Sequence, residues 1–288
     1  MGGIHPGTTL GLVQLAVRDL GRAVLFYTRA LGLSVRGEEG SLVRLGSAER
    51  TVILLEEVPG AAQRAGTAGL YHLALLLPSR FALARALERL LRAHVALEGF
   101  ADHLVSEAIY LSDPEGNGIE LYRDRPRDGW REPGGGLRMG TYELDPDGLL
   151  AELEGPQPPE EEGLRLGHVH LEVSDLAASD RFYLGVLGFQ LMMHMGPSAS
   201  FVSAGGYHHH IGYNTWAGHL APAPAQAVLG LRHFSVLLPD PAALEAAKAR
   251  GRQAGLSREQ DGGDWRLRDP SGIPLTLAAE GQGPAFRA

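Results

Sequence analysis

Short stretches of hydrophobic residues, partly alternating with polar ones, recur along the chain and predict strands. These stretches lie at residues 12–17, 71–77, 168–173 and 232–238. A stretch of helical character follows each of them, at residues 20–31, 80–94, 176–187 and 241–254. Asp19 and Asp175 are placed to cap the start of two of these helices, and Gly32 and Gly188 are placed to end them.

The sequence also repeats itself. LVQLAVRDLGRAVLFYTRALGLSV at 12–35 matches HVHLEVSDLAASDRFYLGVLGFQL at 168–191, with identities at a constant offset of 156 residues. Further on, GLYHLALLLP at 69–78 matches GLRHFSVLLP at 230–239, and DPEG matches DPSG as a turn signal before a last strand. Three strand-like runs follow each predicted helix, so the chain is predicted to be an α+β protein of four βαβββ modules.

One segment interrupts the repeat. Residues 126–165 are rich in proline, glycine and acidic residues, with a short helix expected near 146–153, and are predicted to be the linker between the halves. The predicted domains are therefore 1–125 (modules 1 and 2) and 166–279 (modules 3 and 4), followed by a tail at 280–288.

Composition narrows the chemistry. The 288 residues include no cysteine, which excludes disulfides, thiolate-bound metals and cysteine nucleophiles, whereas 12 histidines and many carboxylates offer nitrogen and oxygen ligands. The formal charge of −8 argues against a nucleic-acid surface. No hydrophobic run approaches the roughly 20 residues of a membrane span, so we expect a cytoplasmic protein without nucleic-acid or membrane partners.

At this point the residues resemble a known family. Module openings of the form V-x-D-L, F-Y and L-G, with endings such as D-P-E-G-N-G-I-E-L-Y, are similar to those of the vicinal oxygen chelate superfamily. That superfamily includes glyoxalase I, fosfomycin and bleomycin resistance proteins, and type I extradiol dioxygenases. DHLVSEAIYLSDPEGNGIELYRDRP at 102–126 and SAGGYHHHIGYNTWAG at 203–218 most resemble the two-domain catechol 2,3-dioxygenases. The resemblance implies modules paired into half-open mixed β-barrels with helices outside.

In that superfamily two paired modules surround a metal, and each module offers one side chain from its first strand and one from its last. Aligned on the repeat, the first-strand positions are Gln14, His72, His170 and His233. The last-strand positions are Glu56, Glu120, Gly212 and Thr276.

The possible pairings differ in the ligands they offer. Modules 2 and 3 combine His72, Glu120 and His170 with no side chain at the fourth position, which is the facial-triad composition of non-heme Fe(II) sites. Modules 1 and 2 offer instead a set of the glyoxalase I type, namely Gln14, Glu56, His72 and Glu120. Modules 3 and 4 offer no carboxylate, and modules 1 and 4 offer a poor set. Histidine is the stronger ligand, which favours modules 2 and 3; His168, on the same predicted face as His170, is the alternative.

The resemblance also implies residues that act beside the metal. Tyr110 and His103 occupy the places of a tyrosine and a histidine that precede the ligand glutamate in extradiol enzymes. The run His209-His210-Ile211-Gly212 resembles the segment that carries the acid–base histidine, with His209 ranked before His210. Strand alternation places His209 on the face opposite to His208 and His210, so a bulge or strong twist would be needed to turn His209 inward.

The resemblance therefore implies an Fe(II)-dependent extradiol dioxygenase of aromatic catabolism, for which Mn(II) is an alternative metal. Its partners would be O2 as cosubstrate and a small aromatic diol, and a homo-oligomer is compatible with the superfamily. Two alternatives stay open: a metal-dependent isomerase of the glyoxalase I (lactoylglutathione lyase) type, and a non-catalytic binding or resistance protein.

Overall fold

The computed structural model describes residues 2–156, 163–225, 227–256 and 263–281. The first two modules each have the predicted βαβββ order. In module 1 the elements are β1 (Thr9–Val17), α1 (Leu20–Arg29), β2 (Ser34–Glu39), β3 (Leu42–Gly46) and β4 (Thr51–Glu57). In module 2 they are β5 (Gly69–Leu77), α2 (Arg80–Arg92), β6 (Leu97–Asp102), β7 (Ser106–Ser112) and β8 (Gly118–Asp124).

The third module has the same order with a modified helix, and the described part of the fourth contains three of the four expected strands. Module 3 contains β9 (Arg165–Glu172), α4 (Leu176–Asp180), the π-helix η3 (Arg181–Val186), β10 (Gln190–Met195), β11 (Ala199–Ser203) and β12 (Ile211–Asn214). Module 4 contains β13 (Gly230–Leu238), α5 (Pro241–Gln253), β14 (Trp265–Arg268) and β15 (Pro274–Ala279). The predicted α+β class of repeated modules is confirmed.

The strands form two sheets whose order pairs the inner and the outer modules. The seven-stranded sheet runs β14-β15-β13-β1-β4-β3-β2, and the eight-stranded sheet runs β10-β11-β12-β9-β5-β8-β7-β6. Modules 2 and 3 thus share one sheet and modules 1 and 4 share the other, which is the pairing that the ligand composition favoured.

The chain divides into two compact units that do not follow the predicted domain boundaries. One unit comprises residues 16–61 and 72–167, and the other comprises 1–15, 62–71 and 168–288. The chain passes from one unit to the other inside strands β1, β5 and β9. Consecutive residues of one continuous strand therefore belong to different units.

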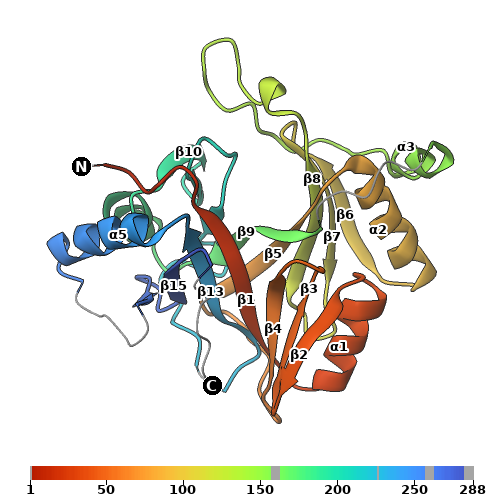
Figure 1. Ribbon diagram of the computed structural model, residues 1–288, viewed down its shortest axis with the longest axis horizontal. Helices are drawn as coiled ribbons and strands as arrows, with labels where there is room; N and C mark the ends of the chain where they lie inside the picture. Colours follow the sequence, from red (N-terminus) through yellow and green to blue (C-terminus); the bar gives the residue numbers. More distant parts are fainter. Residues whose placement is uncertain (1, 157–162, 226, 257–262, 282–288) are drawn as a thin grey trace. The chain divides into compact units, whose positions relative to one another are not determined.

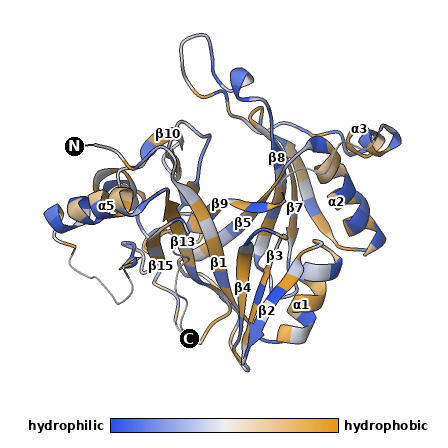
Figure 2. Ribbon diagram, in the orientation of Figure 1, coloured by the Kyte–Doolittle hydropathy of each residue, from blue (hydrophilic) through white to orange (hydrophobic). Residues whose placement is uncertain are grey.

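Each of the four module helices begins at a side-chain cap. The capping side chain accepts a hydrogen bond from the backbone N–H three residues later. The caps are Asp19, Ser79, Asp175 and Asp240. In the unit that holds them, α1 lies against β2, β3 and β4, while α2 lies against β8 (Figure 1). The strands are largely hydrophobic and α2 has one hydrophobic and one hydrophilic side (Figure 2), so the cores form between each helix and its sheet.

The F-Y and D-P-x-G motifs have a structural use. The Tyr27 hydroxyl donates to Asp113 Oδ2 at 2.8 Å, and the Tyr183 hydroxyl donates to Asp269 Oδ2 at 3.1 Å. Burial raises the pKa of both tyrosines well above its ordinary value, so each remains a neutral donor. Each pair joins the helix of one module to the last turn of the next module in the same half.

The segment predicted to be a linker carries structure of its own. It contains η1 (Arg127–Gly129), α3 (Pro146–Leu150) and η2 (Ala151–Glu154), which confirms the short helix expected near 146–153. Leu149 is buried, and Arg80 at the start of α2 donates to Gly148 O at 3.1 Å and pairs with Glu152. This part of the segment is therefore packed on module 2.

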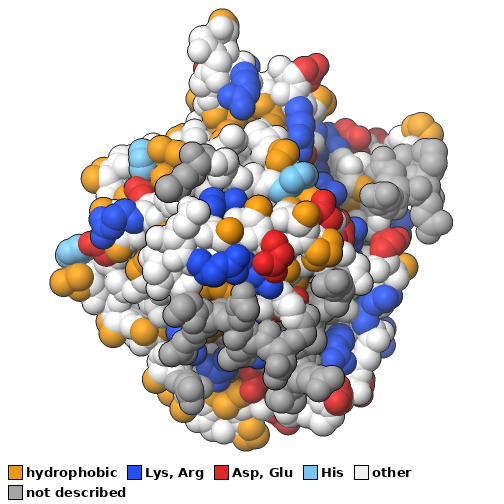
Figure 3. Space-filling view, turned by 60° about the vertical axis from the view of Figure 1, so that its left-hand side comes forward, with side chains coloured by type: hydrophobic (Ala, Val, Ile, Leu, Met, Phe, Trp, Pro, Cys, Tyr) orange, Lys and Arg blue, Asp and Glu red, His pale blue; other side chains and the backbone are white. Residues whose placement is uncertain are grey.

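The surface shows a mixture of side-chain types. On the face drawn in Figure 3, acidic and basic side chains are interspersed with hydrophobic ones. Among the described residues, no helix combines the length and the apolar composition that a membrane crossing requires.

Candidate metal centre

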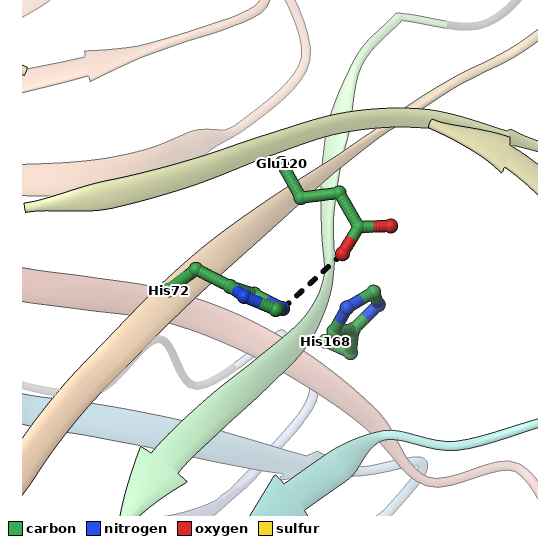
Figure 4. A group of neighbouring side chains, drawn as sticks. All are labelled: His72, Glu120 and His168. Carbon is green, nitrogen blue, oxygen red and sulfur yellow. Dashed lines mark ion pairs between the residues drawn. The ribbon is translucent and has the colours of Figure 1, made fainter. Parts of the chain in front are cut away.

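The site begins with a histidine and a glutamate on neighbouring parallel strands. His72 lies on β5 and Glu120 on β8, and the register of these strands pairs Ala74 with Glu120. The two side chains converge, with His72 Nε2 3.1 Å from Glu120 Oε2 (Figure 4). They are 7% and 3% exposed, and a carboxylate buried to this extent requires a hydrogen-bond partner or a metal.

Tyr110 and His103 lie in the same unit as this pair. Tyr110 on β7 is paired with Glu120 across the antiparallel β7–β8 ladder, and its ring centroid is 5.8 Å from that of His72. The Tyr110 hydroxyl lies 2.7 Å from His103 Nε2. The structure therefore brings together four of the predicted site residues of module 2.

The backbone of the predicted linker determines the proton position on His103. His103 Nδ1 lies 2.8 Å from Gly140 O, and a carbonyl oxygen only accepts, so Nδ1 carries the proton. In the neutral ring Nε2 is then an acceptor, and the Tyr110 hydroxyl donates to it. The Tyr110 oxygen can consequently accept a hydrogen bond from a ligand while its own proton is held by His103.

Two histidines of the other unit, His168 and His209, lie beside each other with their rings tilted by 49°. His168 on β9 is 1% exposed, and its ring centroid lies 4.1 Å from that of His209. Residues 207–210 are not part of a strand, because β12 begins only at Ile211. The alternation of an extended strand does not apply to this run, which explains how His209 is oriented toward His168.

His210 has a different environment. Its Nδ1 accepts from the Ala204 backbone N–H at 3.2 Å and lies 3.0 Å from Ser203 Oγ. Its own backbone N–H donates to Val202 O at 2.9 Å. The His210 ring is thus held by its own hairpin, whereas His209 is the neighbour of His168.

The third member of the group that could hold a metal ion is His168. The ligand atoms of His72, Glu120 and His168 all lie within 4.8 Å of one another, and the three side chains point toward one another (Figure 4). Gly167, the residue before His168, has no room for a side chain, because a Cβ there would overlap the Tyr122 hydroxyl of β8. This close approach of β9 is what only glycine permits.

The structure differs here from the expectation that His170 is the third ligand. His170 Nε2 lies 2.9 Å from Asn214 Nδ2, and its ring lies 5.1 Å from that of Tyr71 and 5.5 Å from that of Trp216. Among the described residues, the group of potential ligands contains His168 and not His170.

A signal in the sequence could have identified His168. His72 stands seven residues before the helix cap Ser79, and His168 stands seven before the cap Asp175, whereas His170 stands five before it. Strand register agrees: Glu120 pairs with Ala74, two residues after His72, and Gly212 pairs with His170, two residues after His168. Counting from the helix caps, instead of from identities in the repeat, gives the first-strand position that lies in the candidate group.

The same count from the helix caps gives the first-strand positions of the outer modules, 1 and 4. His233 stands seven residues before Asp240, and Leu12, not Gln14, stands seven before Asp19. Gln14 and Glu56 lie on β1 and β4 of the seven-stranded sheet. Among the described histidines and carboxylates, the group around His72 does not include Glu56.

In module 4, His233 is paired with a neutral side chain. His233 Nε2 lies 2.6 Å from Thr276 Oγ1, and Thr276 occupies the place that Glu120 has in module 2. Burial, with a contribution from Arg266, lowers the pKa of His233 to about 3, so this imidazole is neutral.

The donor set around His72 fits a divalent metal. Two imidazoles and one carboxylate are the ligands that non-heme iron and other borderline divalent ions accept. The fourth slot is Gly212, which has no side chain to occupy a coordination position. The set therefore has the composition of an open site.

Comparisons with known proteins agree with this fold. The model of the glyoxalase/bleomycin resistance protein/dioxygenase superfamily matches residues 9–121 and 165–277. A curated relative, the catechol-2,3-dioxygenase of Bacillus subtilis (strain 168), is 42% identical over 285 residues, covering 96% of this chain and 99% of its own.

Solved structures show the same fold at low identity. A protein from Bacillus subtilis subsp. subtilis str. 168 superimposes with a TM-score of 0.63 at 14% identity, covering 98% of this chain and 87% of its own. Glyoxalase I from Zea mays superimposes with a TM-score of 0.55 at 16% identity, covering 94% and 92%.

Proposed function

Because the chain belongs to the glyoxalase/bleomycin resistance protein/dioxygenase superfamily, we propose that it is an extradiol dioxygenase that opens the ring of a catechol or related dihydroxy-aromatic. The observation that carries this proposal is the buried group of two histidines and one carboxylate, His72, Glu120 and His168. The relative named catechol-2,3-dioxygenase, similar over nearly its whole length, supports the same reaction.

We assign the metal to these three side chains, in place of the predicted set with His170, and expect Fe(II), with Mn(II) as the alternative. When bound, the metal would hold both diol oxygens and O2, favour loss of a hydroxyl proton and pass electrons from the diol to O2. Gly212 at the fourth slot adds no ligand of its own, and a Cβ there would lie 3.2 Å from the His170 ring.

The protein's own residues would hold the substrate and move its proton. His209, beside His168, would accept a proton from the diol hydroxyl and return it later as a general acid. The Tyr110 hydroxyl donates to His103, so its oxygen would accept a hydrogen bond from the substrate and orient the ring. His210 has its Nδ1 held by Ala204 and is the weaker candidate for the acid–base role.

The glyoxalase I alternative is less well supported. It requires Gln14 and Glu56 to join His72 and Glu120, but β1 and β4 belong to the seven-stranded sheet, whereas β5 and β8 belong to the eight-stranded one. Among the described residues, the group of potential histidine and carboxylate ligands around His72 contains His168 and not Glu56.

A paired substitution tests both the reaction and the ligand set. Protein purified without metal would be loaded anaerobically with Fe(II) and mixed with catechol and O2, and the yellow ring-fission product would be followed by absorbance. We expect His168→Ala to lose stoichiometric metal and at least about 100-fold in kcat/KM, because a ligand is removed. His170→Ala, its matched control on the same strand, should keep the metal.

Two results would contradict the proposal in different ways. Metal lost from the His170 variant but retained by the His168 variant would restore His170 as the ligand. No product from wild-type protein with Fe(II) or Mn(II), across catechols and hydroquinones, would reject the dioxygenase function.

A further inference from the structure

One histidine of the run at 208–210 has no role in the function proposed above, although it is completely buried. His208 is 0% exposed, and its ring lies 4.1 Å from the Tyr207 ring at an interplanar angle of 33°. Its Nδ1 lies 2.8 Å from Nδ1 of His209. A buried imidazole at hydrogen-bond distance from the candidate acid–base residue constrains that residue directly.

The chemistry of this contact determines which nitrogen of His209 faces the reaction. A hydrogen bond between two imidazole nitrogens needs one donor and one acceptor. One of the two Nδ1 atoms therefore carries a proton and the other does not. With Nδ1 of His209 engaged by His208, the nitrogen that can exchange a proton with a substrate is Nε2. A rotation that turned Nδ1 of His209 toward the site would break this bond.

The residues around His208 restrict the movement of its ring. The Tyr207 ring packs on one side of the His208 ring. The backbone N–H of Tyr207 donates to Ala204 O, which closes the turn after β11. His210, on the other side in sequence, is held by Ala204 and Ser203. The two residues that flank His208 and His209 are thus both tied to the same turn.

We propose that His208 is a positioning residue that holds His209 through its Nδ1 and thereby presents Nε2 of His209 as the proton-exchanging atom. The proposal rests on the acid–base role of His209 in the proposed function. His208 itself does not need to touch substrate or metal, and it acts only through its neighbour.

Two substitutions at the same position separate positioning from packing. His208→Asn keeps an amide near the place of Nδ1 and can still bond to His209, whereas His208→Leu fills the space without a polar atom. We expect His208→Leu to lower kcat on the order of 10-fold with an unchanged KM for catechol and unchanged iron content. His208→Asn should recover most of the loss.

A second measurement needs no catalysis. In full-length protein labelled with ¹⁵N-histidine and purified without metal, the ring nitrogen shifts report which nitrogen of each imidazole is protonated. We expect the His209 signals to change in His208→Leu and to stay near the wild-type pattern in His208→Asn. His194→Asn, at an exposed histidine on β10, is the control for nonspecific changes.

The outcomes are distinguishable. Unchanged His209 signals in His208→Leu, an unchanged kcat, or a loss of kcat that His208→Asn does not recover would each overturn the proposal. If wild-type protein opens no diol ring, the proposed function fails and the catalytic part of this inference fails with it, whereas the spectra still decide whether His208 holds His209.

Discussion

Modules 2 and 4 present a histidine at the same place of the same fold, but with opposite consequences. His72 and His233 both stand seven residues before a helix cap, and their partners Glu120 and Thr276 pair with the residue two positions further along the first strand. In module 2 the partner is a buried carboxylate, whereas in module 4 it is a hydroxyl at 2.6 Å.

The fold of a module places two side chains next to each other, and the identity of one of them decides whether the site attracts a metal ion. A carboxylate beside a histidine attracts a cation, whereas a hydroxyl satisfies the imidazole with a neutral hydrogen bond. The first-strand residue of the neighbouring module completes the contrast, because it is His168 in the inner pair of modules and Leu12 in the outer pair.

The largest effect is expected from removing the charge that distinguishes the two modules. Glu120→Gln keeps the size of the side chain but not its charge, so we expect loss of stoichiometric metal and at least about 100-fold in kcat/KM. Metal analysis and the ring-fission assay would measure this. Thr276→Val is the matched variant in module 4 and should retain both; a metal content that Glu120→Gln leaves unchanged would refute the assignment.

An intermediate effect is expected at Tyr110, whose place in module 4 is taken by Arg266. Tyr110→Phe removes the oxygen that would accept the substrate hydrogen bond but keeps the ring beside His72. We expect kcat to fall roughly 10- to 100-fold while the metal stays bound. The same assay with metal analysis checks this, and unchanged kcat would show that the Tyr110–His103 pair is only structural.

A smaller effect, on stability alone, is expected in module 4. The folded pKa of His233 is about 3, below the value of about 6.5 for an unfolded chain. The unfolded state therefore binds more protons below pH 6.5, and stability falls as the pH drops from there toward 3. At pH 5 this amounts to about 2 kcal/mol.

Substituting His233 tests this linkage. Thermal unfolding of His233→Leu and wild type, compared at pH 7 and pH 5, should show a smaller drop in Tm for the variant, by roughly 4 °C. Ring-opening activity at pH 7 should be unaffected. Equal pH dependence in the two proteins would mean that His233 is protonated in the folded state.

Much of the architecture could be predicted because it depends on local signals. The helix caps Asp19 and Asp175, the alternating strands and the repeat led to the βαβββ modules. His72, Glu120, Tyr110 and His103 could be identified together because all belong to one module, on β5, β8, β7 and the turn between β6 and β7, and match the motifs of the family that the chain resembles. The orientation of His209, which the resemblance implied, could not be derived from strand alternation, because residues 207–210 are outside the strands and do not follow a two-residue period.

The fold class, the fourfold repeat and the types of side chain available for chemistry follow from the amino-acid sequence. The tertiary structure decided that strands of modules 2 and 3 share a sheet and that His168, not His170, joins His72 and Glu120. The physical reason is that His168 and His170 point to the same face of β9, so their spacing cannot distinguish them. The register of β9 in its sheet, in which Gly167 packs against the Tyr122 hydroxyl, determines which of the two histidines lies near the carboxylate.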